Sequence, residues 1–229
     1  GGPLHPVPPP RGRLPAPGAA PAPLPRPNSP PATASGTAHV TRAYTDKSTH
    51  APGTQATITA EASGDGTVHF TVSHLGVEVA SGDATVENGK ATWSYTTPGE
   101  NNQGYLVTAT GADGTHAETA LDVSSSWTRF PRMGYLSHFK PTAPAGTDGN
   151  TTYESFLFQQ PQDYINKLSQ DYHINALQYY DWQYRHEQPV ATGDLESQWP
   201  LWYANTYASK KTISDYVTDA KNANISSLA

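Results

Sequence analysis

Apolar and polar side chains alternate in short runs through residues 37–125. Apolar residues occupy every second position of each run, which is typical of β-strands with one buried face. About seven such strands, with no helical pattern between them, favour an immunoglobulin-like β-sandwich. The apolar positions are Ala56/Ile58/Ala60, Val68/Phe70/Val72, Val77/Val79, Ala91/Trp93/Tyr95 and Tyr105/Val107/Ala109.

Turn and core signals refine this prediction. Asn88-Gly89 lies between two of the runs and predicts a two-residue hairpin turn. The chain contains no Cys, so the disulfide that joins the two sheets of many such sandwiches is impossible here. We therefore expect Phe70 and Trp93 to fill the centre of the core.

The pattern changes after residue 125. Short apolar strands are expected at Met133–Phe139, from Ile174, and over Ile225–Ala229. Helical periodicity lies between them, at 161–172 and from Thr212. This β-α-β-α-β order predicts parallel strands joined by right-handed crossovers.

Each predicted helix has a start signal and an apolar stripe. Pro161 suits the first position of a helix, where its missing N–H costs nothing. Thr212 is expected to cap the second helix, with Asp215 three residues later completing an approximate capping box. The predicted buried stripes are Ile165/Leu168/Tyr172 and Ile213/Val217/Ala220.

The predicted loops are long on one side only. Residues 140–160 and 182–211 follow strands, whereas the joins that follow helices are short. Loops at the carboxyl ends of parallel strands build the active sites of (β/α)8 barrels. We therefore interpret residues 126–229 as the first βαβαβ part of a (β/α)8 TIM barrel. A complete barrel needs about 250 residues, so it is expected to be truncated in this chain.

Residues 1–36 have a low-complexity composition. Thirteen of the 21 prolines lie between Pro3 and Pro31. Proline fixes φ and lacks a backbone donor, so a disordered tail with polyproline II character is expected. A linker is the simpler interpretation, and a ligand for a proline-recognising groove is the alternative.

The charge distribution limits the possible partners. The formal net charge is −6, and residues 1–45 contain four Arg and no acid, so the remainder carries −6 − 4 = −10. An acidic folded part argues against nucleic acid as a partner. No apolar run approaches the roughly 20 residues that span a bilayer. The chain begins with Gly1 instead of Met, and we interpret it as a fragment or processed product.

Possible metal ligands have simpler explanations. Asp65, Asp83 and Asp113 do not follow the alternating pattern of a calcium loop, and Asp beside Gly is ordinary turn chemistry. His69 and His74 have no third ligand in view. We predict no metal site and no cofactor.

Candidate chemistry is concentrated at 174–186, where a short apolar strand runs into Asp181, Trp182, Arg185 and His186. Asp181 and Arg185 could form a fixed ion pair, which we prefer to a catalytic role for Asp181. Aromatic rings beside polar groups suit carbohydrate, although some of these rings are expected to pack the loop onto the barrel. The rings of the loop are Trp182, Tyr184, Trp199, Trp202, Tyr203 and Tyr207.

Three segments carry a family resemblance. Residues 127–137 (WTRFPRMGYLS), 165–168 (INKL) and 172–186 (YHINALQYYDWQYRH) resemble glycoside hydrolase family 66, and the resemblance covers about residues 40–229. This family contains endo-dextranases and cycloisomaltooligosaccharide glucanotransferases. It implies an immunoglobulin-like domain at 37–125 followed by a catalytic (β/α)8 barrel.

The resemblance implies cleavage of the α-1,6 bonds of dextran with retention, by an Asp nucleophile and a Glu acid/base. Both lie beyond Ala229 in the family's order, so no catalytic residue is assigned here and the chain alone is expected to be inactive. A glucanotransferase or a non-catalytic glucan-binding module remains an alternative. The parent protein is expected to be a secreted monomer. The residues implied to contact glucose units are Tyr135, Asp181, Trp182, Arg185 and His186.

Overall fold

The computed structural model describes residues 35–136, 161–195, 197–200 and 207–228. Residues Thr33–Ala229 form one compact unit. Almost all of the predicted tail at 1–36, and all of the predicted loop at 140–160, lie outside the described residues. None of the described helices is both long enough and apolar enough to cross a membrane.

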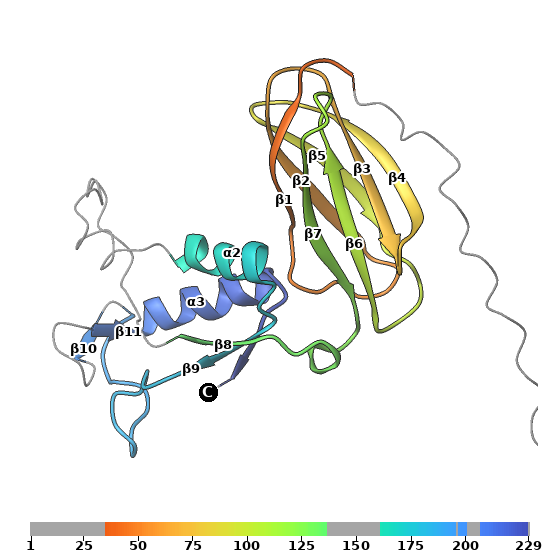
Figure 1. Ribbon diagram of the computed structural model, residues 1–229. Helices are drawn as coiled ribbons and strands as arrows, with labels where there is room; N and C mark the ends of the chain where they lie inside the picture. The colour runs from red at the N-terminus through yellow and green to blue at the C-terminus, as the bar shows by residue number, and fades with distance from the viewer. Residues whose placement is uncertain (1–34, 137–160, 196, 201–206, 229) are drawn as a thin grey trace, which may run out of the picture. The chain divides into compact units, whose positions relative to one another are not determined.

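Two antiparallel sheets form a β-sandwich in the first part of this unit (Figure 1). The fourth strand pairs with the third, so it belongs to the larger sheet. One sheet contains, in order, β1 (His39–Thr45), β2 (Gln55–Ser63) and β5 (Lys90–Thr96). The other contains, in order, β4 (Val77–Thr85), β3 (Thr67–His74), β6 (Gln103–Thr110) and β7 (His116–Val123).

The core of the sandwich follows the predicted alternation. Ile58, Phe70 and Val107 are completely buried between the two sheets. Trp93 is half-buried and stacks on Phe70 with 5.9 Å between ring centroids. A Cβ at Gly82 would lie 2.4 Å from the Trp93 ring, so the absence of a side chain at Gly82 leaves room for the indole. Phe70 therefore occupies the core as predicted, with Trp93 packed at its edge.

The prediction that Val77 and Val79 face the core is wrong. Their side chains are 45% and 50% exposed. The register between β3 and β4 shifts between Val72 and Ser73, and Val72 pairs with Ala80. This β-bulge reverses the alternation, because one extra residue moves the following side chains to the other face. Ala80 packs against the core instead.

The Asn88-Gly89 turn forms, but it does not join two neighbouring strands of one sheet. Both residues have positive φ, 51° and 79°, as a type I′ turn requires. Glu87 and Lys90 exchange backbone hydrogen bonds of 2.7 and 3.1 Å across the turn. Beyond this single bridge, β4 and β5 separate into different sheets. The two-residue hairpin turn is therefore as predicted, and the strands that it joins continue into different sheets.

The second part of the unit has the predicted parallel arrangement. A 3-10 turn at Trp127–Arg129 leads into a three-stranded parallel sheet with neighbouring strands in chain order. A small antiparallel hairpin interrupts the long second loop and was not predicted. The elements are β8 (Met133–Leu136), α2 (Pro161–Tyr172), β9 (Ala176–Tyr179), β10 (Gln198–Pro200), β11 (Tyr207–Ser209), α3 (Lys210–Asn222) and β12 (Ser226–Leu228).

Helix α3 begins earlier than predicted. Ser209, and not Thr212, is its N-cap, and the Ser209 side chain accepts a hydrogen bond from the backbone N–H of Thr212. The buried face consists of Thr212, Tyr216 and Ala220, while Val217 is 39% exposed. Thr212 lies inside the helix and is buried, so the predicted capping box with Asp215 does not form.

Helix α2 starts at Pro161 as predicted, but its last turn differs from the predicted stripe. Ile165 is completely buried, whereas Tyr172 is 60% exposed. Ser169 is buried instead. Its hydroxyl accepts a 2.7 Å hydrogen bond from Ser48 of the sandwich. The final turn therefore meets polar groups, and Tyr172 stays outside.

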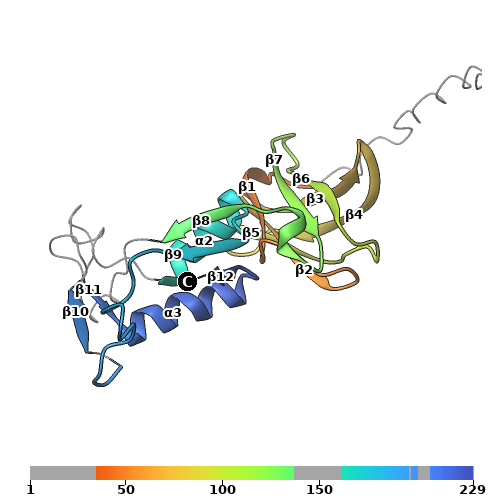
Figure 2. The same ribbon diagram turned by 90° about the horizontal axis from the view of Figure 1, so that it is seen from below.

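The two helices lie side by side on one face of the parallel sheet (Figure 1, Figure 2). Leu136, Leu177 and Tyr179 of the sheet are buried in the core that includes residues of both helices. Met133 and Tyr135 alternate with these positions on β8 and are 48% and 65% exposed. The sheet is thus covered on one face and open on the other among the residues that the structure describes.

A completely buried amide, Asn175, connects the strands of this sheet. Its Oδ1 accepts a hydrogen bond of 2.9 Å from the N–H of Arg132, and its Nδ2 donates one of 2.6 Å to the carbonyl of Phe130. The backbone N–H of Asn175 donates to the carbonyl of Arg132, and its carbonyl accepts a hydrogen bond from the N–H of Ser226. One residue before β9 therefore fixes the entry into β8 and the start of β12.

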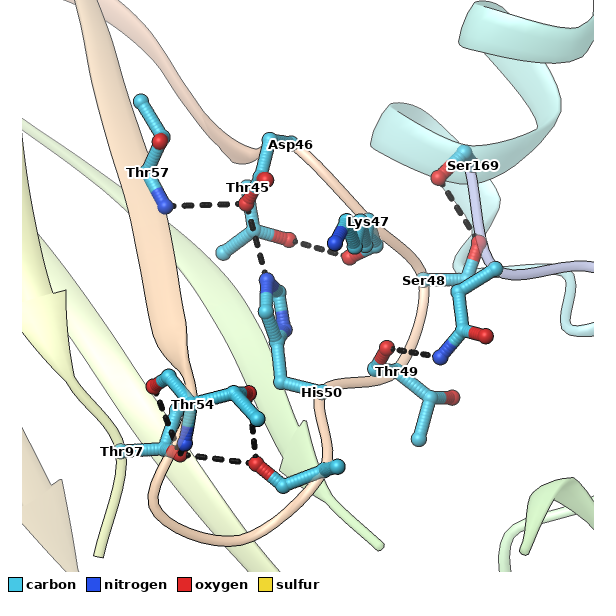
Figure 3. A network of polar contacts seen from close by, with 12 residues as sticks. Thr45, Asp46, Lys47, Ser48, Thr49, His50, Thr54, Thr57, Thr97 and Ser169 are labelled. Atoms are coloured by element: carbon cyan, nitrogen blue, oxygen red, sulfur yellow. Dashed lines mark hydrogen bonds and ion pairs between the residues drawn. The ribbon is translucent and has the colours of Figure 1, made fainter. Parts of the chain in front are cut away.

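The segment 46–50, directly after β1, joins the sandwich to the helices (Figure 3). The Ser48 hydroxyl donates to Ser169 near the end of α2, and the Ser48 N–H donates to the carbonyl of Ala223, the C-cap of α3. Asn224 ends α3 in the left-handed conformation, with φ of 57°, and its side-chain amide donates to the carbonyl of Thr49. The carboxyl-terminal ends of both helices are therefore held by the same short segment.

Within that segment, Asp46 fixes the loop to the sandwich. Its Oδ1 lies 2.8 Å from Nε2 of the buried His50 and accepts a 2.9 Å hydrogen bond from the N–H of Thr57 (Figure 3). Burial acts to raise the pKa of Asp46, but the contacts with His50 and Thr57 outweigh it, so the pKa is lowered. The carboxylate therefore stays charged and keeps both bonds at neutral pH.

Two further polar contacts connect the sandwich with the second part. Arg132, just before β8, pairs with the buried carboxylate of Asp122 at the end of β7. His173 lies between α2 and β9, and its Nε2 is 3.1 Å from the hydroxyl oxygen of Thr119. Burial lowers the pKa of His173 below its ordinary value of 6.5, so the neutral ring is favoured.

We expect Asn175→Ala to lower the free energy of unfolding by about 2–4 kcal/mol, because two partly buried backbone groups lose their partners and a fully buried side chain is removed. Urea denaturation of the chain measures this change. Asn222→Ala is the matched control, since Asn222 is exposed at the end of α3 and should change stability by less than about 0.5 kcal/mol. An Asn175→Ala variant as stable as the control would contradict the role assigned to the amide.

We expect acid to destabilise the fold partly through His173. Because its pKa is lowered by folding, the unfolded chain takes up the proton first, and stability falls as the pH drops below about 7.5 until the folded ring is protonated. His173→Asn keeps a residue that tolerates the left-handed φ of 51° and cannot titrate. Urea unfolding at a series of pH values should show a smaller loss for this variant than for His116→Asn, a change at an exposed His. Equal pH profiles would refute this assignment.

Candidate functional site

The carboxyl ends of β8 and β9 emerge at the same edge of the parallel sheet. Leu136 pairs with Tyr179, and the N–H of Tyr180 extends the ladder by donating 2.9 Å to the carbonyl of Leu136. Tyr135, the second-to-last residue of β8, and the segment after Tyr180 therefore lie at the same edge of the sheet. This edge is where ligands bind in parallel α/β sheets.

The chain changes direction at Asp181, two residues after the end of β9. Its φ is 52°, in the left-handed region, which Asp and Asn tolerate better than other side chains. Its side chain is exposed. The chain therefore turns away from the sheet at Asp181 and presents this carboxylate to solvent at the edge.

The predicted ion pair between Asp181 and Arg185 is wrong. In the described chain no ion pair links the two residues, and the Arg185 guanidinium lies over the ring of Tyr184, 4.6 Å from its centroid. Spacing of four residues places side chains on the same side of a helix, but it fixes no such contact in a loop. Here Arg185 and Gln188 instead exchange backbone hydrogen bonds of 3.2 Å in a tight turn.

Most of the described aromatic rings of the loop pack against the core and hold the loop in place. Trp199 is 2% exposed, and its Nε1 donates a hydrogen bond of 3.3 Å to the carbonyl of Trp182. Tyr184 meets Trp199 edge to face at 6.5 Å. Trp182 and Tyr184 are half-buried against the same core. Trp202 and Tyr203 lie outside the described residues, and for Tyr207 only its place in β11 is described.

Four of the five predicted sugar-contacting residues are free to meet a ligand. Tyr135, Asp181, Arg185 and His186 are exposed, while Trp182 is half-buried. Within the described part of the chain, no hydrogen bond or ion pair joins these five side chains to one another. The structure brings Tyr135 to the same edge as the others, but their role in binding stays a prediction.

Sequence reasoning missed Gln178. It pairs with Tyr135 across the parallel ladder, so both side chains lie on the open face of the sheet. Leu177 and Tyr179, on either side of it, are buried on the helix-covered face. A polar residue between two buried apolar ones in a strand was a usable signal. Gln178 adds an amide that can both donate to and accept from a ligand.

The loop carboxylates have different roles. Asp194 accepts hydrogen bonds from the backbone N–H and the hydroxyl of Ser197, at 2.8 and 2.9 Å, so it stabilises a turn. Glu187 is exposed. Among the described residues no group of three His, Asp or Glu side chains is placed to hold a metal ion. The side chains described at this edge are therefore an aromatic ring and exposed hydrogen-bonding groups, a combination that suits a polyhydroxylated ligand.

Comparison with known proteins gives consistent matches. Residues 45–229 match the family model described as Glycosyl hydrolase family 66. Two cycloisomaltooligosaccharide glucanotransferases of Niallia circulans are 33% identical over 183 residues and 31% identical over 211 residues. These alignments cover 74% and 86% of this chain but only 18% and 20% of the relatives.

A solved structure agrees with these matches. The crystal structure of a cycloisomaltooligosaccharide glucanotransferase from a Paenibacillus species, complexed with cycloisomaltoheptaose, superimposes with a TM-score of 0.69 and 31% identity. The match covers 85% of this chain and 28% of that one, and the chain spans about a fifth of the length of the two curated relatives. The family model matches far more than half of the chain and agrees with the resemblance of its motifs: the chain belongs to glycosyl hydrolase family 66.

Proposed function

We propose that this chain is the N-terminal part of an enzyme that cleaves the α-1,6-glucosidic bonds of dextran. The observation that carries the proposal is the family match over residues 45–229. The proposed mechanism is retaining, with a carboxylate nucleophile and a carboxylic acid about 5–5.5 Å apart. Both would be carried by later parts of the polypeptide, and no catalytic residue is assigned to this chain.

The proposed catalytic domain is a (β/α)8 barrel. Its support is the three parallel strands in chain order, with two helices on one face. Met133 and Tyr135 are exposed on the other face, as expected of residues that point into a barrel completed by further strands. The long loop after β9 would then lie on the catalytic side.

The edge residues are proposed to hold glucose units. The exposed ring of Tyr135 can pack against the apolar C–H face of a sugar, and Asp181 can accept hydrogen bonds from its hydroxyls. Arg185 and His186 can donate to ring and glycosidic oxygens. Trp182, half-buried, is proposed to contribute one edge of its indole and to support the loop. Such contacts would orient the substrate for carboxylates elsewhere in the barrel.

Transfer is the second candidate function. The two curated relatives are named as glucanotransferases, which favours an enzyme that passes the glycosyl group to a sugar hydroxyl, closing a ring, instead of to water. Both reactions share the covalent intermediate and differ in the acceptor.

Secretion and a monomeric state are also proposed, the first because a polymeric substrate such as dextran is met outside the cell.

We expect the chain 1–229 by itself to release no reducing sugar from dextran, because the proposed catalytic pair is absent from it. A reducing-sugar assay measures this, with the full-length parent enzyme as the positive control. Activity of the chain alone would place catalytic carboxylates within residues 1–229.

In the full-length enzyme we expect Tyr135→Ala and Asp181→Asn each to lower kcat/KM on dextran about 10- to 100-fold, the effect of losing roughly 1.4–2.8 kcal/mol of binding in the transition state. Asn tolerates the left-handed φ of Asp181, so the backbone is preserved. Glu187→Gln, a change at an exposed carboxylate of the same loop, should stay within about twofold.

If kcat/KM is unchanged in both Tyr135→Ala and Asp181→Asn, neither residue contacts the substrate as proposed. Product analysis in the same experiment separates the two candidate reactions. Linear sugars with reducing ends indicate hydrolysis, whereas rings without reducing ends indicate transfer.

A further inference from the structure

A groove with a volume of about 420 Å³ lies where β1, β6 and β7 of the sandwich approach the end of α2. The end of α2 leads into β9, so the groove lies toward the amino ends of the parallel strands. The edge that carries Tyr135 and Asp181 is at their carboxyl ends. The groove is therefore separate from the proposed substrate site. Its lining includes Arg42, Leu106, Glu118, Ala120 and Asp171.

The cation of the groove is held in one orientation. Arg42 donates hydrogen bonds of 2.9 Å to Glu61, 3.0 Å to Gln170 and 2.6 Å to Asp171. Its guanidinium also lies over the ring of Tyr44, 4.5 Å from the centroid. A side chain fixed on three sides loses little conformational entropy when a ligand binds beside it.

An unpaired carboxylate lies beside an apolar strip in the same groove. In the described chain Glu118 is exposed and has no hydrogen-bond or ion-pair partner. Leu106 and Ala120 are directly opposite each other on β6 and β7, and Glu118 lies on the same face two residues before Ala120. Leu106 is 42% exposed. The groove thus offers acceptors next to a small apolar surface.

The charges select against an anionic ligand. The single positive charge of Arg42 is already shared by Glu61 and Asp171, and Glu118 adds a third carboxylate, so these four groups carry 1 − 3 = −2. Phosphates, nucleic acid and acidic sugars would be repelled. A neutral ligand with many hydroxyls fits, since hydroxyls donate to carboxylates and sugar C–H groups pack on Leu106.

We propose that this groove binds a short stretch of neutral polysaccharide chain at a second site, distinct from the edge with Tyr135 and Asp181. The chemistry of the groove specifies a neutral polyhydroxylated ligand, and its identification as an α-1,6-glucan rests on the proposed function. A polymer held at the groove keeps other parts of the same molecule at high local concentration near the enzyme.

Isothermal titration of the chain 1–229 with linear isomaltoheptaose tests the proposal. Glu118→Ala and Leu106→Ala should each weaken binding about tenfold or more, because one removes the free acceptor and the other the apolar surface. Both side chains are exposed, so the fold should survive, and circular dichroism checks this. Glu100→Ala, which removes an exposed acid before β6 and outside the groove, is the matched control and should bind like the unmodified chain.

Absence of binding by the unmodified chain, or equal binding by both groove variants and the control, overturns the proposal. Loss of binding in Asp181→Asn with normal binding in Glu118→Ala also overturns it, because the sugar would then bind at the edge alone. The proposed function is tested separately by the activity of the full-length enzyme. If sugar binds at the groove but the full-length enzyme does not cleave dextran, the second site is supported and the proposed function is contradicted.

Discussion

The arrangement of the parallel sheet depends on a polar side chain in a place that water does not reach. Asn175 is completely buried, and its amide satisfies backbone groups of Arg132 and Phe130 that would otherwise be unpaired. An unpaired buried group costs more than a typical hydrogen bond contributes, so alternative registers of β8 against β9 are penalised. The position of Tyr135 beside Gln178 at the ligand-facing edge follows from this register.

The sandwich and the parallel sheet have separate apolar cores, and polar contacts connect them. The segment 46–50 forms hydrogen bonds with the carboxyl-terminal ends of both helices, while Arg132 and His173 contact β7. Directional contacts of this kind fix an orientation more than they add stability. Because they act at the amino ends of the strands, the sandwich supports the second part without obstructing the edge where Asp181 emerges.

Much of the fold could be predicted because the side-chain period is strong where strands are regular. The apolar runs at Ile58, Phe70 and Val107 gave the sandwich, and Pro161 gave the start of α2. Prediction failed where periodicity leaves the phase open: a bulge placed Val79 on the outer face of β4, and the buried face of α3 is centred on Tyr216, one residue before Val217.

At the candidate site the types of residue predicted an exposed polar edge, but the spacing of the residues did not predict which side chains contact each other. Asp181 and Arg185 are four residues apart, but the spacing of charged residues has a fixed meaning only where the backbone is helical.

The bulge in β4 also bears on how the molecule behaves in a crowded solution. β4 is an edge strand, with unpaired backbone groups along its outer side and the exposed side chains of Val77 and Val79. A flat apolar edge would invite a second copy to extend the sheet. The bulge twists this edge, and Glu78 places a charge between the two exposed valines, so both features guard the sandwich against edge-to-edge aggregation.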